Sequence, residues 1–427
     1  MKLPKLFGKK LTGDGKAAAY NAASLAFFQF ANYIFPLVTI PFLTRVLGSY
    51  NYGLTIFVTV LTGYAITFAD YGFNLSATRL VAINKSNDKY VSEIFCSITI
   101  IKLVIFIICA IPIFFVIRVQ GEYSTETMLF LAAYVGGLGQ IMTPIWLFQG
   151  LEAMRPVIYI QLVSKLAACV FIFTLVDSPK DYLLVVAINS IFFLLGGFLS
   201  LLKAKKIAAL RIYIPETKTL LFYLKDGFSI FVSNVSISLY TTSANFVIGV
   251  ALGPAALAQF SAADKIVQLL KTSYLPVVQA GYPLIGRRVK TSKNDGIRLA
   301  WKFGAACSCM SFFLGVLCFV YADELVKLVF GDGFADAASL LKVMAFVPVF
   351  TCLSYVLGIL VMLNLELRKE FTIILAASGL LGLILVILSV NTVGLQGVSW
   401  SVFAAELIVA ASMSAFLFCK RRMGSQL

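Results

Sequence analysis

Long apolar segments repeat along the whole chain and set the strongest limit on its fold. A hydrocarbon core about 30 Å thick requires roughly 20 apolar residues per helix. The sequence has 427 residues, 60% of them hydrophobic, and contains twelve runs of about that length between residues 17 and 419. Twelve spans and their connections use the whole length, so no room remains for a separate extramembrane domain. The sequence therefore predicts an all-α polytopic membrane protein with about twelve transmembrane helices.

Basic residues are distributed unequally between the two sets of connections. If the amino terminus is cytoplasmic, 26 of the 35 Lys and Arg residues fall in cytoplasmic segments and five in the opposite segments. This bias predicts that both termini and the basic 203–225 connection are cytoplasmic. A basic face beside anionic lipid also accounts for the net charge of +15. Membrane lipids are therefore expected partners and nucleic acid is not.

Residue types that carry catalysis or bind metals are missing or scattered. The chain contains no histidine, and its eight cysteines lack the paired spacing of a zinc or redox site. We also find no nucleophile with a base, no carboxylate dyad and no metal cluster. The sequence predicts no cofactor, no metal site and no enzymatic activity.

The chain divides into two related halves. Leu47-Gly48 follows the first span and Leu252-Gly253 follows the seventh, an offset of 205 residues. The long basic connection lies between spans six and seven. We therefore expect two pseudo-symmetric six-helix lobes around a central cavity, an amino-terminal lobe at 1–213 and a carboxy-terminal lobe at 214–427.

Polar side chains recur with helical spacing on spans 1, 2, 7 and 8. The stripes include Asn32 on span 1, Ser233, Ser236 and Tyr240 on span 7, and Gln268 on span 8. Because these spans are equivalent in two six-helix repeats, their polar faces would converge on one cavity. The alternative is that such hydroxyls bond to the preceding helical turn or hold helices together.

Five charged residues lie inside spans: Asp70, Asp264, Lys265, Lys271 and Glu406. A charge at the bilayer centre costs about 2.5–3.5 kcal/mol, so such residues normally face a bundle interior or water. With histidine absent, the three carboxylates are the candidate ion-coupling or proton sites. Asp264 and Lys271 lie two turns apart on one helical face. Either lysine could contact an anionic substrate or only neutralise a buried acid.

Three further basic residues lie toward span ends. Lys102 and Lys165 are expected to extend toward the cytoplasmic interface. Arg79 is suited equally to anchoring a span and to contacting a substrate phosphate.

Several segments together resemble a known family. They are the stretch 21–53, with Pro36, Pro41 and Gly48; Asp70-Tyr71-Gly72-Phe73 followed by Ser76-Ala77-Thr78-Arg79; Pro144 to Glu152; and Phe260-Ser261-Ala262-Ala263-Asp264-Lys265-Ile266. In these residues the chain resembles the lipid-linked oligosaccharide (O-antigen type) flippases of the polysaccharide transporter family, in the multidrug/oligosaccharidyl-lipid/polysaccharide exporter superfamily.

The resemblance implies a bacterial inner-membrane protein with two lobes and a cationic cavity. Its substrate would be an undecaprenyl-pyrophosphate-linked repeat unit of a surface polysaccharide such as O-antigen, moved from the cytoplasmic to the periplasmic leaflet by alternating access. The resemblance leaves open whether the protein contacts the polymerase and chain-length proteins of the same pathway. The candidate substrate-binding residues are Lys265, Lys271, Gln268, Arg79, Asn32, Ser233, Ser236 and Tyr240.

Two other functions compete with this one. An ion-coupled multidrug exporter of the same superfamily would need a net acidic cavity, whereas here the buried lysines at least balance the acids. A membrane-embedded glycan polymerase or ligase would need catalytic groups in a sizeable periplasmic loop, which this sequence lacks.

Overall fold

The computed structural model describes residues 13–119 and 121–422, and within this part the regular structure is helical. The elements, in chain order, are α1 (Gly13–Asp70), α2 (Phe73–Ile83), α3 (Asp88–Val119), η1 (Gly121–Tyr123), α4 (Thr127–Met142), α5 (Ile145–Gly150), α6 (Met154–Leu175), η2 (Pro179–Asp181), α7 (Tyr182–Ile207), α8 (Thr217–Thr291), α9 (Lys293–Val320), α10 (Ala322–Phe330), η3 (Asp332–Phe334), α11 (Ala335–Met344), α12 (Val347–Tyr355), η4 (Val356–Met362), α13 (Arg368–Thr392) and α14 (Leu395–Arg422).

The two longest helices are each broken at one glycine. Gly48 in α1 has φ 74° and Gly253 in α8 has φ 79°, values that interrupt a right-handed helix and that glycine adopts at little cost. The Leu-Gly repeat of the sequence therefore marks the same backbone feature in both halves. Each helix consists of a first and a second arm joined at this break.

The number of separate spanning helices differs from the expected twelve. In the described residues, nine helices are long and apolar enough to cross a membrane, or ten if the bent pair Asp332–Met344 and Val347–Met362 is one span. The difference arises because α1 and α8 are each counted as one helix, although each consists of two helices that meet at a break, at Gly48 or at Gly253. Counting the two arms of each helix separately gives twelve segments in that part of the chain.

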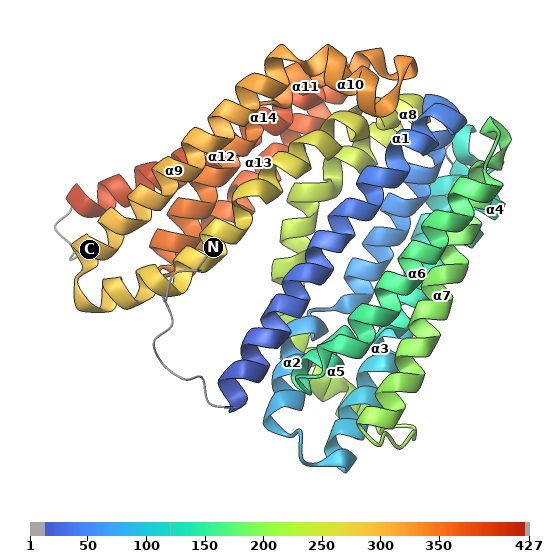
Figure 1. Cartoon of the computed structure of the whole chain (residues 1–427), viewed down its shortest axis with the longest axis vertical. Coiled ribbons are helices and arrows are strands. Elements are labelled where there is room, and N and C mark those ends of the chain that lie inside the picture. Colours follow the sequence, from blue (N-terminus) through green and yellow to red (C-terminus); the bar gives the residue numbers. More distant parts are fainter. Residues whose placement is uncertain (1–12, 120, 423–427) are drawn as a thin grey trace, which may run out of the picture.

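Two groups of helices meet near α10 and spread apart toward the other end (Figure 1). One group contains α3, α4, α6 and α7, and the other contains α9, α12, α13 and α14. We call the end of the molecule near α10 the α10 end. The opposite end, where residues 208–216 join α7 to α8, is the linker end.

The start of α8 packs on helices of the first half. Tyr223 is buried in one cluster with Phe73, Ala77 and Val81 of α2, and the ring of Phe231 stacks on that of Tyr71 with centroids 4.4 Å apart. These contacts cross the expected boundary between residues 213 and 214. The division into lobes at 1–213 and 214–427 stays a prediction.

Candidate functional site

Lys271 and Glu406 form an ion pair in the interior of the second half. Lys271 Nζ lies 3.1 Å from Glu406 Oε1, with the two side chains 19% and 8% exposed. Lys271 lies in the second arm of α8 and Glu406 near the middle of α14. Of the two roles that the sequence left open for Lys271, the direct contact is with a buried acid, and that acid is Glu406 of α14 and not Asp264 on the same face of α8.

The pair belongs to a small polar cavity of about 60 Å³. Ser243 and Asn245 enter it from the first arm of α8, and Asp264 and Gln268 enter it from the second arm. Ser261 Oγ lies 3.1 Å from Asn245 Oδ1, so the arms on both sides of Gly253 are joined by a polar contact. Gly382 of α13 and Ala405 of α14 also line the cavity, and their small size leaves room beside the carboxylates.

Asp264 differs from the other two intramembrane carboxylates. Within the described residues it has no ion pair at 4 Å or less, whereas Glu406 pairs with Lys271. Carboxylate, amide and hydroxyl oxygens together are suited to a proton or a small hard cation. Among the described residues no group of three His, Cys, Asp or Glu side chains is arranged to hold a metal ion.

A second intramembrane ion pair lies in the first half. Lys102 Nζ is 2.7 Å from Asp70 Oδ1, and the lysine side chain is only 4% exposed. Asn74 Nδ2 donates to the other carboxylate oxygen at 3.3 Å. The expectation that Lys102 reaches the membrane surface is wrong: the end of α1 supplies a carboxylate within the bundle, so the lysine stays inside.

Lys265 lies on a different face of α8 from Lys271. The side chains of Lys265 and Ser273 are exposed, and the side chain of Thr272 is half-buried. Six residues at about 100° each separate the two lysines by about 120° around the helix axis. In the described part of the chain Lys265 forms no ion pair, so the structure leaves its charge available on this face.

Three threonines in the second arm of α1, which belong to the polar stripe expected on span 2, follow the alternative that the sequence left open: their hydroxyls bond to the preceding helical turn. Thr55, Thr59 and Thr62 donate to the carbonyls of Tyr52, Thr55 and Val58 at 2.7–2.8 Å. The hydroxyls are therefore used within their own helix. The side chains of Asn32, Ser233, Ser236 and Tyr240 lie outside the described residues, so their placement stays a prediction.

A further cavity, of about 170 Å³, lies between α1, α6 and α7. Thr39, Ser164, Lys165 and Asn189 are its polar lining residues. Lys165 is the twelfth of the 22 residues of α6, near mid-helix rather than at the cytoplasmic end. A lysine at the centre of an apolar helix of this length is the sequence signal that could have predicted this site. The expectation that Lys165 extends toward the cytoplasmic interface overlooked that signal.

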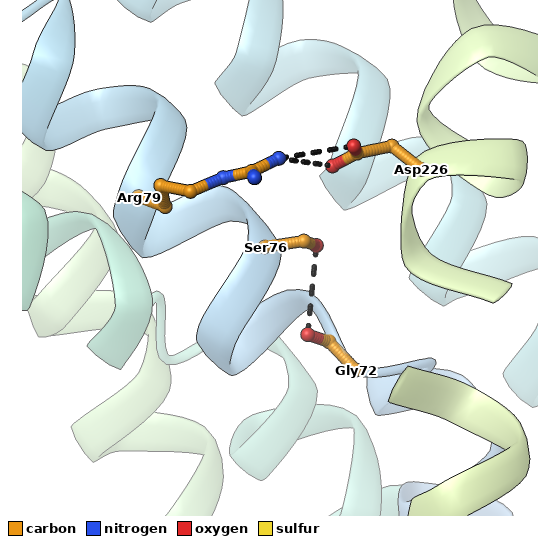
Figure 2. A network of polar contacts seen from close by, with 4 residues as sticks. All are labelled: Gly72, Ser76, Arg79 and Asp226. Atoms are coloured by element: carbon orange, nitrogen blue, oxygen red, sulfur yellow. Dashed lines mark hydrogen bonds and ion pairs between the residues drawn. The ribbon is translucent and has the colours of Figure 1, made fainter. Parts of the chain in front are cut away.

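Arg79 joins α2 to the first arm of α8 at the linker end. Its Nη2 lies 3.0 Å and 3.3 Å from the two carboxylate oxygens of Asp226 (Figure 2). In the same view Ser76 donates to the carbonyl of Gly72. Gly72 has φ 80°, and an added Cβ would lie 2.6 Å from Ile230. The two helices are therefore in close contact directly beside the ion pair.

The α10 end is closed by contacts between the two halves. Arg45 of α1 donates to the carbonyl of Leu328 of α10, and the Tyr123 hydroxyl donates to the Gly249 carbonyl at 2.9 Å. Gly53 lies so close to α8 that an added Cβ would be 1.9 Å from the Pro254 carbonyl oxygen. Polar cavities in the interior are thus separated from this end by tightly packed backbone.

Comparison with known proteins identifies relatives over nearly the full length. A family model described as "Polysaccharide biosynthesis protein" matches residues 18–289. Two relatives carry the name "Putative O-antigen transporter". The protein of Escherichia coli (strain K12) is 30% identical over 397 residues, which are 93% of this chain and 96% of the relative. The protein of Shigella dysenteriae is 25% identical over 394 residues, which are 90% and 96%.

Solved structures of transporters share the fold. The lipid II flippase MurJ in an inward closed conformation superposes with a TM-score of 0.69 at 12% identity, covering 92% of this chain and 87% of its own. An inward-facing multidrug resistance MATE family transporter of the MOP superfamily gives 0.67 at 15% identity, covering 92% and 95%. At these identities the likeness establishes the fold, and the relatives above carry the comparison of function.

Proposed function

Because the chain belongs to the family of polysaccharide biosynthesis proteins and is a multi-span membrane transporter, we propose that it is an O-antigen type flippase. The proposed substrate is an undecaprenyl-pyrophosphate-linked oligosaccharide, moved from the cytoplasmic to the periplasmic leaflet of the bacterial inner membrane. The observation that carries the proposal is 30% identity to a named O-antigen transporter across 93% of the chain.

The charges inside the bundle support an anionic substrate. A pyrophosphate that crosses a low-dielectric slab needs positive charge and hydrogen-bond donors along its path. Lys265 offers an exposed cation on α8, and Lys165 places a second one near mid-helix in α6. Lys271 is held by Glu406, so we assign it to the support of the site more than to direct contact with phosphate. Gln268, Arg79, Asn32, Ser233, Ser236 and Tyr240 stay candidates for contacts to the sugars or phosphates.

The mechanism we propose is alternating access, in which the two groups of helices rock about the substrate. The closed α10 end and the divergence of the helices toward the linker end fit a state that faces the linker end. The basic connections favour a cytoplasmic location for that end and for both termini. If transport is coupled to an ion, Asp264 is the first candidate site, because Asp70 and Glu406 each have a lysine partner.

The multidrug exporter is the remaining alternative. Its cationic cargo would be favoured by a surplus of negative charge in the interior. Two of the three intramembrane carboxylates are neutralised by lysines here, so the interior lacks that surplus. A direct partnership with polymerase or chain-length proteins of the pathway stays an expectation.

The test of the proposed function is deletion of the gene followed by analysis of lipid-linked intermediates. A lipid-linked repeat unit should accumulate on the cytoplasmic leaflet and surface glycan should be lost, with both restored by the intact gene. Normal surface glycan together with a changed sensitivity to cationic drugs would support the exporter instead. Reporters fused after Leu427 test the topology. A reporter that works only in the cytoplasm should be active there, and one that works only in the periplasm should be inactive.

A further inference from the structure

A groove lies outside the polar cavities described above, at the end of the group of α9, α12, α13 and α14 that is remote from α10 (Figure 1). It has a volume of about 930 Å³ and is lined by α9, η4, the turn that follows η4, and α14. Binding sites that enclose a ligand typically have volumes of about 300–1,000 Å³. None of Asp264, Gln268, Lys271 and Glu406 lines this groove, so it is separate from the candidate transport site.

The floor and walls of the groove are apolar. Leu357 and Val361 of the π-helix η4 form the floor and are 1% and 5% exposed. Trp301 of α9 and Phe418 of α14 form the walls and are 50% and 57% exposed. π-Helical segments are rare and occur often at functional sites. Tryptophan and phenylalanine walls at the end of two spanning helices are suited to an acyl chain entering from the bilayer.

One rim of the groove belongs to a strongly basic segment of the chain. Arg298 lines it with Asp295 and Asn294, and in the described part of the chain the guanidinium forms no ion pair within 4 Å. The segment 287–302, which runs from the end of α8 into α9, contains six basic residues and one acidic residue. A basic cluster near a membrane surface attracts anionic lipid by about 1 kcal/mol per Lys or Arg.

We propose that this groove is a binding site for an anionic phospholipid. An acyl chain would lie on η4 between Trp301 and Phe418, and the phosphate would meet Arg298 at the rim. Charge complementarity selects an anionic headgroup over a zwitterionic one. The ligand would connect α9 to α14 and stabilise the end of this group of helices, because a ligand that binds the folded protein shifts its stability by mass action. The proposal does not depend on the identity of the transported substrate.

Tryptophan fluorescence in lipid nanodiscs tests the site, because the chain has three tryptophans. Trp146 is 2% exposed and inaccessible to lipid, whereas Trp400 is 57% exposed. In a Trp400→Phe background, the fluorescence quenched by lipid is that of Trp301. Brominated phosphatidylglycerol, present as a minor component in phosphatidylcholine, should quench this signal about threefold more than the same fraction of brominated phosphatidylcholine.

Two variants and one control complete the experiment. Arg298→Ala should abolish the preference for phosphatidylglycerol and Arg298→Lys should retain part of it. Ala415→Phe should fill the groove and abolish the preference while Arg298 is present. Arg368→Ala removes an exposed basic residue at the start of α13, outside the groove, and should change nothing. Thermal melting of each purified variant shows whether it is folded.

Three results would overturn the proposal. The first is equal quenching by the two brominated lipids in the Trp400→Phe protein. The second is a preference that persists in both Arg298→Ala and Ala415→Phe. The third is displacement of brominated phosphatidylglycerol by polyprenyl phosphate at ratios at which unlabelled phosphatidylglycerol has no effect, which would assign the groove to the substrate's own lipid.

Discussion

Lys271 of α8 and Glu406 of α14 form an ion pair at 3.1 Å between two helices that are 135 residues apart in sequence. Both side chains are largely removed from solvent, so each charge depends on the other. Removing one partner of a buried pair typically costs about 3–5 kcal/mol, because the remaining charge is left uncompensated. The pair therefore connects the helix that carries Asp264 to the last helix of the chain.

Lys271→Ala should lower the amount of protein in the membrane and its melting temperature. Lys271→Ala combined with Glu406→Gln should restore both, since no charge is then left buried without a partner. The same lysine variant combined with Asp264→Asn is the matched control and should not be rescued. Immunoblots of membrane fractions and thermal melting measure the effect. Rescue of Lys271→Ala by Asp264→Asn and not by Glu406→Gln would contradict the assignment of Glu406 as the partner.

Lys265→Ala should leave the protein level normal and impair transport. The side chain is exposed and has no ion pair among the described residues, so its removal leaves no buried charge. A charge-assisted hydrogen bond to phosphate contributes about 1.5–3 kcal/mol, and the transport rate should therefore fall roughly 10- to 100-fold. Lys265→Arg should retain part of the rate because the charge persists.

Lys180→Ala is the control for Lys265, since it removes an exposed lysine in the connection between α6 and α7. Its rate of surface-glycan synthesis should equal that of the unmodified protein. Normal glycan in cells that carry Lys265→Ala would exclude this lysine from the substrate path.

Asp264→Asn tests ion coupling. The substitution keeps the size and polarity of the side chain and removes its charge inside the cavity of Ser243, Asn245 and Gln268. Protein level should stay normal, whereas transport should no longer respond to an imposed proton or sodium gradient. Proteoliposomes that contain labelled lipid-linked sugar provide the measurement. A response equal to that of the unmodified protein would show that coupling, if it exists, uses another group.

Some of the site could be predicted from the sequence, for a physical reason. Asp70, Asp264, Lys271 and Glu406 are charged residues within apolar runs, and burial of a charge in a membrane is costly enough to mark such residues in any sequence. The pairing of these charges could not be predicted, because it depends on how helices distant in sequence pack. Helical spacing on α8 suggested Asp264 for Lys271, whereas the contact with α14 decides the partner.

The fold was predictable to a similar extent. The lengths of the apolar runs predicted the spans, and the Leu-Gly repeat predicted that Gly48 and Gly253 occupy equivalent positions in the two halves. The sequence did not show that both glycines have a positive φ, because Leu-Gly permits that backbone conformation without requiring it. The groove on η4 was also hidden, since neither the π-helix nor the separation of α9 and α14 has a local sequence pattern.

Arg79 and Asp226 should affect transport more than stability. The arginine side chain is 61% exposed, and exposed ion pairs contribute about 0–1 kcal/mol, so Arg79→Ala should melt normally. The pair joins α2 to the first arm of α8, and both single variants Arg79→Asp and Asp226→Arg should slow transport by repulsion. The exchanged double variant should recover the rate. If it stays as slow as the singles, Arg79 acts through substrate contact and not through Asp226.

Gly53 offers a test of the closed α10 end. An added Cβ would lie 1.9 Å from the Pro254 carbonyl oxygen, and because both partners are backbone the helices would have to separate. Gly53→Ala should therefore weaken the contact between α1 and α8 by about 1–3 kcal/mol. It should raise the labelling of a single cysteine placed at the buried position Ala258 of α8, with the native cysteines replaced. Gly63→Ala is the matched control in the same helix: a Cβ there meets no atom within 4 Å, and replacing a helical glycine by alanine should stabilise the protein by about 0.5–1 kcal/mol. Unchanged labelling in Gly53→Ala, with a normal melting temperature, would mean that the α1–α8 contact does not hold this end closed.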